Sequence, residues 1–174
     1  MWTIQNKYPL PLIPQQIDCL WGCTLFTKFN IWWGYNVVQV KKGHEWKATF
    51  TTNKGLYEPT VMFFRLTNSP ATFQSMMNMR FRNQIASSEL TIYMDNMAMH
   101  MSPKEGETHE EHLEHHRKIV NEVLAILKQN NLYLNINKCE FKQAHIDFLG
   151  VRIENNQLKM EDTKIEKVQD WALP

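Results

Sequence analysis

Apolar residues recur along the chain at two spacings, one typical of helices and one typical of strands. Over residues 109–129 they return every three or four positions, which predicts the longest helix of the chain. Its core-facing stripe consists of Leu113, His116, Val120, Val123, Leu124 and Leu127. Ser69 and Pro70 are typical of a helix start, with Ser69 as the cap. The face that follows this pair carries Phe73, Met76, Met77 and Phe81. Shorter helices are expected to begin near Pro14 and Asp162.

Runs of apolar or alternating residues, separated by turn residues, predict strands. The expected strands cover 25–29, 37–40, 46–52, 90–93, 97–101, 132–134, 140–141 and 148–153. Two of them flank Asp95 and Asn96, which predicts a hairpin with a polar turn. Because hairpins are frequent and helices are interspersed among them, we expect an α+β fold with an antiparallel sheet rather than a doubly wound parallel sheet.

Composition narrows the class of protein. The chain has 174 residues, of which 43% are hydrophobic and 21% charged, so it can bury one domain-sized core. Its formal net charge of +1 argues against a polybasic nucleic-acid-binding tail, although a local basic groove is compatible with it. Three cysteines make no disulfide framework, and we find no signal peptide and no apolar run long enough to span a membrane. We therefore expect an intracellular protein, cytoplasmic or nuclear, that is not secreted and has no membrane partner.

Six short motifs follow one another along the whole chain. They are Asn-Lys-Tyr-Pro-Leu-Pro at 6–11, Thr27-Lys28 followed by Trp-Gly-Tyr-Asn at 33–36, Phe63-Phe64 followed by Leu-Thr-Asn-Ser-Pro-Ala-Thr-Phe-Gln at 66–74, Tyr-Met-Asp at 93–95, Lys-Cys-Glu-Phe at 138–141, and Phe-Leu-Gly at 148–150. In this order the motifs resemble the reverse transcriptases of gypsy-type long-terminal-repeat retrotransposons. The resemblance implies a polymerase palm, which is a ferredoxin-like antiparallel sheet backed by helices, together with part of the fingers.

The same resemblance implies the domain organisation and the partners. We expect one reverse-transcriptase domain fragment over 1–174, with the fingers part within about 36–90 and the palm in the rest, and without a thumb or ribonuclease H portion. The family copies RNA into DNA, so its partners are an RNA or DNA template–primer and a deoxynucleoside triphosphate. The oligomeric state is left open.

Three positions decide whether this copy can perform the family's reaction. In the family, three aspartates hold two Mg²⁺ ions for nucleotidyl transfer. Here those positions carry Asn30, Asp95 and Asn96. An asparagine offers one neutral oxygen, whereas Mg²⁺ prefers charged oxygen ligands. We therefore expect Mg²⁺ not to be bound tightly, Asp95 to be a weak or unoccupied metal ligand, and the copy to be catalytically inactive.

Further site residues follow from the resemblance, position by position. Those matching the family's nucleotide-binding side are Trp33, Gly34, Tyr35, Phe64, Arg65 and Gln74, and those matching its primer grip are Phe148, Leu149 and Gly150. Tyr35 matches the aromatic residue that rejects a ribose 2′ hydroxyl. Arg65 departs from the family pattern, which has glycine at this position.

Two alternatives to an inactive polymerase stay open, namely a non-catalytic nucleic-acid-binding or interaction module and a weak residual polymerase. A basic groove leading to Asp95 would favour binding, and the fingers-side half contains Lys28, Lys41, Lys42, Lys47, Lys54, Arg65, Arg80 and Arg82. His112 and His116 are four residues apart and could share a zinc ion, but a solvated helix face is the favoured interpretation. Cys19 and Cys23 are interpreted as free thiols.

Overall fold

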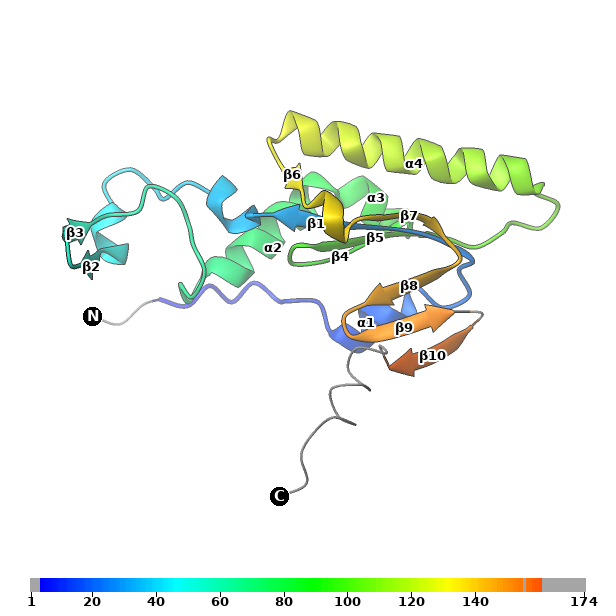
Figure 1. Cartoon of the computed structure of the whole chain (residues 1–174), viewed down its shortest axis with the longest axis horizontal. Coiled ribbons are helices and arrows are strands. Elements are labelled where there is room, and N and C mark those ends of the chain that lie inside the picture. Colours follow the sequence, from blue (N-terminus) through cyan, green and yellow to red (C-terminus); the bar gives the residue numbers. More distant parts are fainter. Residues whose placement is uncertain (1–3, 155, 161–174) are drawn as a thin grey trace, which may run out of the picture.

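A central antiparallel sheet organises the molecule (Figure 1), whose computed structural model describes residues 4–154 and 156–160. Its strands run in the order β4 (Leu90–Tyr93), β5 (Asn96–Met101), β1 (Leu25–Trp32) and β6 (Tyr133–Leu134), and β7 (Glu140–Gln143) also pairs with β1. The strand β1 therefore lies in the middle of the sheet, and most of its residues are buried. The expected α+β class with an antiparallel sheet is confirmed.

Helices cover one face of this sheet. They are α2 (Ser69–Arg80), α3 (Arg82–Ala86) and the long α4 (His109–Gln129), which lies across the top of the sheet in Figure 1. Met97 and Met99 of β5 are buried in the same cluster as residues of α2 and α4. Ala98, between them, belongs to a second cluster, because successive strand residues point to opposite faces.

The other face packs against a smaller sheet and a short helix. The elements are α1 (Ile13–Asp18), β8 (His145–Phe148), β9 (Val151–Glu154) and β10 (Gln157–Met160), with the strand order β10–β9–β8. Phe26 of β1, Phe148 and Ile153 are each about 1% exposed and form the centre of this second core. The central sheet is therefore buried between two apolar layers.

The two longest helices differ in how they begin. The helix α4 has the predicted bounds, and a capping box fixes its start, because Thr108 accepts from the backbone amide of Glu111 while Glu111 accepts from that of Thr108. The expected capping role of Ser69 is wrong by one residue. Asn68 occupies the cap position, and the Ser69 hydroxyl instead donates to the carbonyl of Phe63 (3.0 Å).

The segment before α2 extends away from the sheet and contains little regular structure (Figure 1). It consists of the 3-10 helices η1 (Gly34–Val37) and η2 (Glu45–Ala48) and the hairpin of β2 (Phe50–Thr52) and β3 (Gly55–Tyr57). The predicted strand at 37–40 is wrong apart from an isolated bridge between Gln39 and Val61. The strand predicted at 46–52 is wrong for its first half, because Trp46 and Phe50 are about half exposed and no core lies beneath their alternation.

Near the C-terminal end, the strand predicted at 148–153 is instead a hairpin. Leu149 and Gly150 both adopt positive φ values, 52° and 88°, and form the tight turn between β8 and β9. A further 3-10 helix, η3 (Ile136–Lys138), connects β6 to β7. The helix predicted near Asp162 lies outside the described residues. None of the helices in the described part of the chain is long and apolar enough to cross a membrane.

Candidate active site

The turn between β4 and β5 brings the three expected catalytic positions together. Tyr93 pairs with Asn96, so Met94 and Asp95 form a two-residue turn, in which Met94 has a φ of 58°. On the neighbouring strand β1, Asn30 pairs directly with Asn96. The hairpin turn and the end of β1 therefore lie side by side.

The side-chain amide of Asn30 lies between two oxygen acceptors. Its Nδ2 donates to Asp95 Oδ2 and to Asn96 Oδ1, both at 3.2 Å. An ionised carboxylate can only accept hydrogen bonds, so Asn30 must turn its nitrogen rather than its oxygen toward Asp95. The Asn30 side chain is 7% exposed, which keeps water from competing strongly for this contact.

This arrangement does not fit two magnesium ions. Mg²⁺ prefers charged oxygen ligands in octahedral geometry, and the three positions offer one carboxylate. The amide nitrogen of Asn30 also presents hydrogens to the space between Asp95 and Asn96, where a cation would need oxygen atoms. Within residues 4–154 and 156–160, no three His, Cys, Asp or Glu side chains gather closely enough to hold a metal ion.

Gln74 of α2 holds the backbone of the same turn. It is fully buried in α2, its Oε1 accepts from the backbone amide of Met94 at 2.7 Å, and its Nε2 donates to the carbonyl of Ile92 at 3.1 Å. The sequence predicted that Gln74 lies on the nucleotide-binding side. It did not reveal that both the oxygen and the nitrogen of its side-chain amide form hydrogen bonds within the protein. In this structure Gln74 positions the turn that carries Asp95.

Aromatic residues beside the turn form the surface expected to face a nucleotide. Tyr35 is buried between Phe64 and Phe73, with ring centroids 4.8 Å and 5.2 Å away. Burial is the larger cause that raises the pKa of Tyr35, and the negative charge of Asp95 raises this pKa further, so the hydroxyl stays protonated. Phe64 and Trp33 are each 70% exposed and leave their rings open to solvent.

Two backbone positions on this surface are constrained. A Cβ atom on Gly34 would lie 2.5 Å from Cζ of Phe73, so the close approach of η1 to α2 requires glycine. Arg65, at the position where the resemblance implies glycine, has a φ of 72°, a left-handed conformation that favours glycine. The exposed Arg65 therefore occupies a backbone conformation that glycine adopts with less strain.

The hairpin expected to grip a primer end shares an apolar core with the strand that leads into the β4–β5 turn. Phe148 is 1% exposed, and Leu149 packs against the same apolar cluster as Tyr93, which immediately precedes the turn. Leu149 and Gly150 form the tip of the hairpin. The hairpin is thus coupled to the candidate site through a shared core.

The interpretation of His112 and His116 as a solvated helix face is wrong, whereas the place of His116 in the predicted core-facing stripe is confirmed. His112 and His116 are 6% and 1% exposed and face the sheet. Nε2 of His116 lies 2.8 Å from the hydroxyl of Thr27, and Nδ1 of His112 lies 3.2 Å from Glu107. Both side chains are therefore part of the packing between α4 and the sheet.

A second histidine site was not foreseen from the sequence. His100 on β5 lies 2.9 Å from the hydroxyl of Thr91 and 3.5 Å from the sulfur of Cys23. Burial lowers the pKa of His100 to about 4 and raises that of the Cys23 thiol, so both groups are neutral and the pair lacks the thiolate that a nucleophile needs. The expectation of free thiols is confirmed for Cys19 and Cys23, and Cys139 is free as well.

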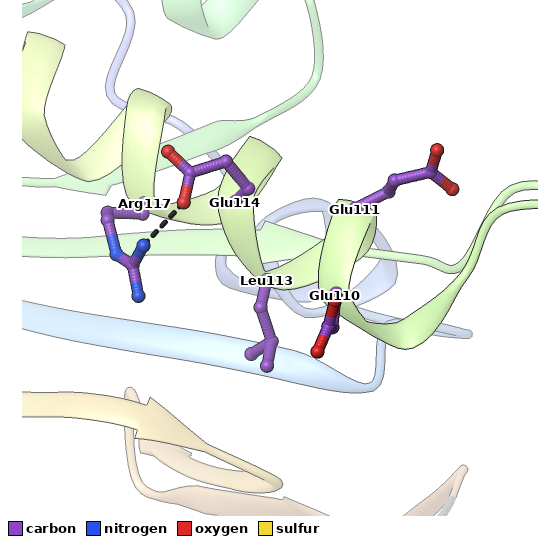
Figure 2. Close-up of a pocket in the computed structure, with 5 residues that line it drawn as sticks. All are labelled: Glu110, Glu111, Leu113, Glu114 and Arg117. Atoms are coloured by element: carbon purple, nitrogen blue, oxygen red, sulfur yellow. Dashed lines mark hydrogen bonds and ion pairs between the residues drawn. The ribbon is translucent and has the colours of Figure 1, made fainter.

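A hollow along the first turns of α4 lies apart from these residues. Figure 2 shows its lining, which consists of Glu110, Glu111, Leu113, Glu114 and Arg117. Arg117 forms an ion pair with Glu114, which leaves the charges of Glu110 and Glu111 unbalanced, so the net charge of the lining is negative. Such a surface would repel a phosphate backbone, and it shares no residue with the candidate site.

Sequence comparison places the chain among polymerases. The family model described as "Reverse transcriptase (RNA-dependent DNA polymerase)" matches residues 2–153. The Transposon Tf2-7 polyprotein of Schizosaccharomyces pombe is 35% identical over 169 residues, and the Transposon Tf2-3 polyprotein of the same organism is 34% identical. Each match covers 97% of this chain and 12% of the polyprotein, so the chain spans about an eighth of the length of these relatives.

Structural comparison agrees on the fold. The foamy viral protease–reverse transcriptase in complex with an RNA/DNA hybrid superimposes with a TM-score of 0.84 and 19% identity, over 98% of this chain and 22% of the viral one. The same viral protein in complex with double-stranded DNA gives a TM-score of 0.76 with 18% identity, over all of this chain and 33% of the other. These matches support a palm-and-fingers fold. The chain therefore belongs to the reverse transcriptase family, in the branch carried by the polyproteins of long-terminal-repeat retrotransposons.

Proposed function

We propose that this chain is a polymerase palm with part of the fingers that has lost nucleotidyl transfer while keeping the fold. The fingers part lies within about 36–90 and the palm in the rest. The observation that carries the proposal is the hydrogen-bonded cluster of Asn30, Asp95 and Asn96. It occupies the place of the family's three aspartates with one negative charge, and its central side chain donates hydrogen bonds where the reaction needs oxygen ligands.

The test is single-nucleotide incorporation on a primed RNA template, with Mg²⁺ and separately with Mn²⁺. The parent chain is expected to incorporate nothing above background. The double variant Asn30→Asp/Asn96→Asp should bind Mg²⁺ together with nucleotide and extend the primer slowly, and adding Arg65→Gly should raise the rate further by clearing the nucleotide side. An Asp95→Asn variant of the double mutant is the matched control and should be inactive.

Robust incorporation by the parent chain, abolished by Asp95→Asn, would contradict the proposal and establish a residual polymerase. Incorporation by the parent that Asp95→Asn leaves unchanged would point to a contaminating enzyme. The experiment would then be repeated after further purification until the parent signal is assigned.

A second candidate function is binding of a template–primer without catalysis. The segment that carries β2 and β3 exposes several lysines next to half-exposed aromatic rings. These residues are Lys41, Lys42, Lys47, Lys54, Trp46, Phe50 and Tyr57. Basic side chains that follow a phosphate backbone, combined with rings on which bases stack, are typical of nucleic-acid contacts. The solved viral relatives hold an RNA/DNA hybrid and double-stranded DNA, which supports the same class of partner here.

Lys28 contributes less to such a surface, because it forms an ion pair with Glu140 at 3.3 Å. Binding is measured by fluorescence anisotropy with an RNA/DNA hybrid over a range of salt concentrations. Replacing Lys41, Lys42 and Lys47 by glutamine should weaken binding and reduce the salt slope by about 0.9 per lost phosphate contact. A control with Lys118→Gln and Lys128→Gln, both exposed on α4, should leave the slope unchanged, and an equal loss in the control would contradict this surface.

We propose an intracellular location, cytoplasmic or nuclear, because the three cysteines are free thiols. A deoxynucleoside triphosphate is the proposed small-molecule ligand only if the carboxylates are restored. Isothermal titration of the parent chain with nucleotide and Mg²⁺ should then show no saturable heat.

A further inference from the structure

The turn that carries Asp95 is fixed by direct hydrogen bonds on two sides. From β1, the backbone amide of Ile31 donates to the carbonyl of Asp95 at 2.8 Å, and the side chain of Asn30 donates to the carboxylate of the same residue. From α2, Gln74 accepts from the amide of Met94. Every one of these contacts is made by the protein itself.

The hydrogen bond from Asn30 to Asp95 requires asparagine, and not aspartate, at position 30. An aspartate at this position would bring a second acceptor-only carboxylate against Asp95, and two carboxylates at hydrogen-bond distance repel each other unless a cation or proton lies between them. An asparagine has nearly the same shape but carries two donor hydrogens. Both find acceptors here, one on Asp95 and one on Asn96.

We propose that the amide of Asn30 replaces the divalent cation as the cross-link of this site, so that the chain holds its β4–β5 turn closed without metal. The substitution therefore does more than remove a ligand, because it converts a cluster that needs a cation into one that is complete by itself. The inference goes beyond the proposed function, since it concerns the conformation of the turn and does not depend on whether the chain binds nucleic acid.

Burial strengthens this cross-link. Asn30 is 7% exposed and lies on the central strand, where β5 pairs with it on one side. A hydrogen bond to a charged acceptor in a site with little water is stronger than one at the surface. Removing the amide would leave Asp95 facing a neighbour that offers no donor.

The test is thermal unfolding of the full chain in EDTA and in 10 mM Mg²⁺. The parent should show the same melting temperature in both buffers, within about 1 °C. Asn30→Asp should lower the melting temperature in EDTA by about 4–10 °C, which is the range expected from losing a charge-assisted hydrogen bond in a chain of this size. Mg²⁺ should restore a part of this loss in Asn30→Asp and a larger part in Asn30→Asp/Asn96→Asp.

The matched control is Asn121→Asp, which makes the same chemical change on an exposed position of α4. It should shift the melting temperature by less than about 1 °C in either buffer. A second variant, Asn30→Ala, removes the donor without adding a charge. It should also be destabilised, but Mg²⁺ should not rescue it.

Two results would overturn the inference. One is a parent chain whose melting temperature rises by several degrees in Mg²⁺, since that would show that a bound cation still stabilises the chain. The other is an Asn30→Asp variant that is as stable in EDTA as the Asn121→Asp control. Both results are read from the melting temperature, whereas the proposed function is tested by primer extension, so failure of the cross-link and failure of the proposed function are told apart.

Discussion

Replacing Arg65 by glycine is expected to stabilise the chain, although it removes a large side chain. The φ of Arg65 is 72°, in the left-handed region, where a Cβ atom crowds the following carbonyl oxygen at a cost of about 1–2 kcal/mol. Glycine avoids this cost but loses more conformational entropy on folding, which offsets about 0.5–1 kcal/mol of the gain. The net expectation is a free energy of unfolding that is higher by about 0.5–1 kcal/mol.

Equilibrium unfolding in urea measures this change. With a slope of about 2 kcal/mol per molar urea, the midpoint should rise by about 0.3–0.5 M while the slope stays constant. Two variants separate backbone from side-chain effects. Arg65→Ala keeps the Cβ atom and should gain nothing, and Arg82→Gly, at an exposed position in the first turn of α3, should lower stability by up to about 1 kcal/mol.

An Arg65→Gly variant that is less stable than the parent would refute the strain at this position. A gain of equal size in Arg65→Ala would refute the backbone explanation, since it would trace the effect to the guanidinium. Either outcome would also weaken the view that this copy descends from a chain with glycine here.

Two further predictions concern buried groups. Burial, followed by the neighbouring histidine charges, lowers the pKa of His100 and His116 to about 4, so the unfolded chain binds more protons than the folded one between about pH 4 and 6.5. The free energy of unfolding should therefore be highest above pH 6.5 and should fall as the pH drops toward 4, by up to about 3 kcal/mol for each histidine. A melting temperature that does not change across this pH range would contradict the prediction. Gly34→Ala should cost about 1–3 kcal/mol in a urea titration, because its Cβ would lie 2.5 Å from Phe73, and Phe73→Leu in the same chain should recover part of the loss; additive effects of the two changes would argue against the clash.

The parts of the fold that could be predicted are those where local signals and burial agree. The helix α4 combines a long apolar stripe with a capping box, and the β4–β5 hairpin combines apolar strands with a short turn. The strand predicted at 37–40 failed because valine-rich sequence favours a strand only where a neighbour offers a partner. Here Val38 and Val40 exchange single backbone bonds with Met62 and Thr60 instead of joining the sheet.

The candidate site was predictable in its members but only partly in its geometry. The order of motifs identified Asn30 and Asp95 as neighbours, which the register of β1 with β5 bears out. The direction in which the Asn30 amide points, and the use of both ends of Gln74, depend on contacts between residues 18 or more positions apart. The burial of His112 was missed although its partner Glu107 is only five residues away, because a polar residue at a core-facing position cannot be told from a solvated one by its type.

The methionines of β5 have a consequence for how this chain tolerates change. Met97, Met99 and Met101 are all buried on the face that meets the helices. Methionine is unbranched and has a polarizable sulfur, so it adjusts to irregular gaps by rotating about its own torsions. A facing residue on α2 or α4 can therefore gain or lose a methylene, and the strand absorbs the difference before it reaches the backbone of Asp95. Apolar substitutions that face these methionines can therefore accumulate in the helices without displacing the turn, whereas Gln74 contacts the turn directly and is not shielded in this way.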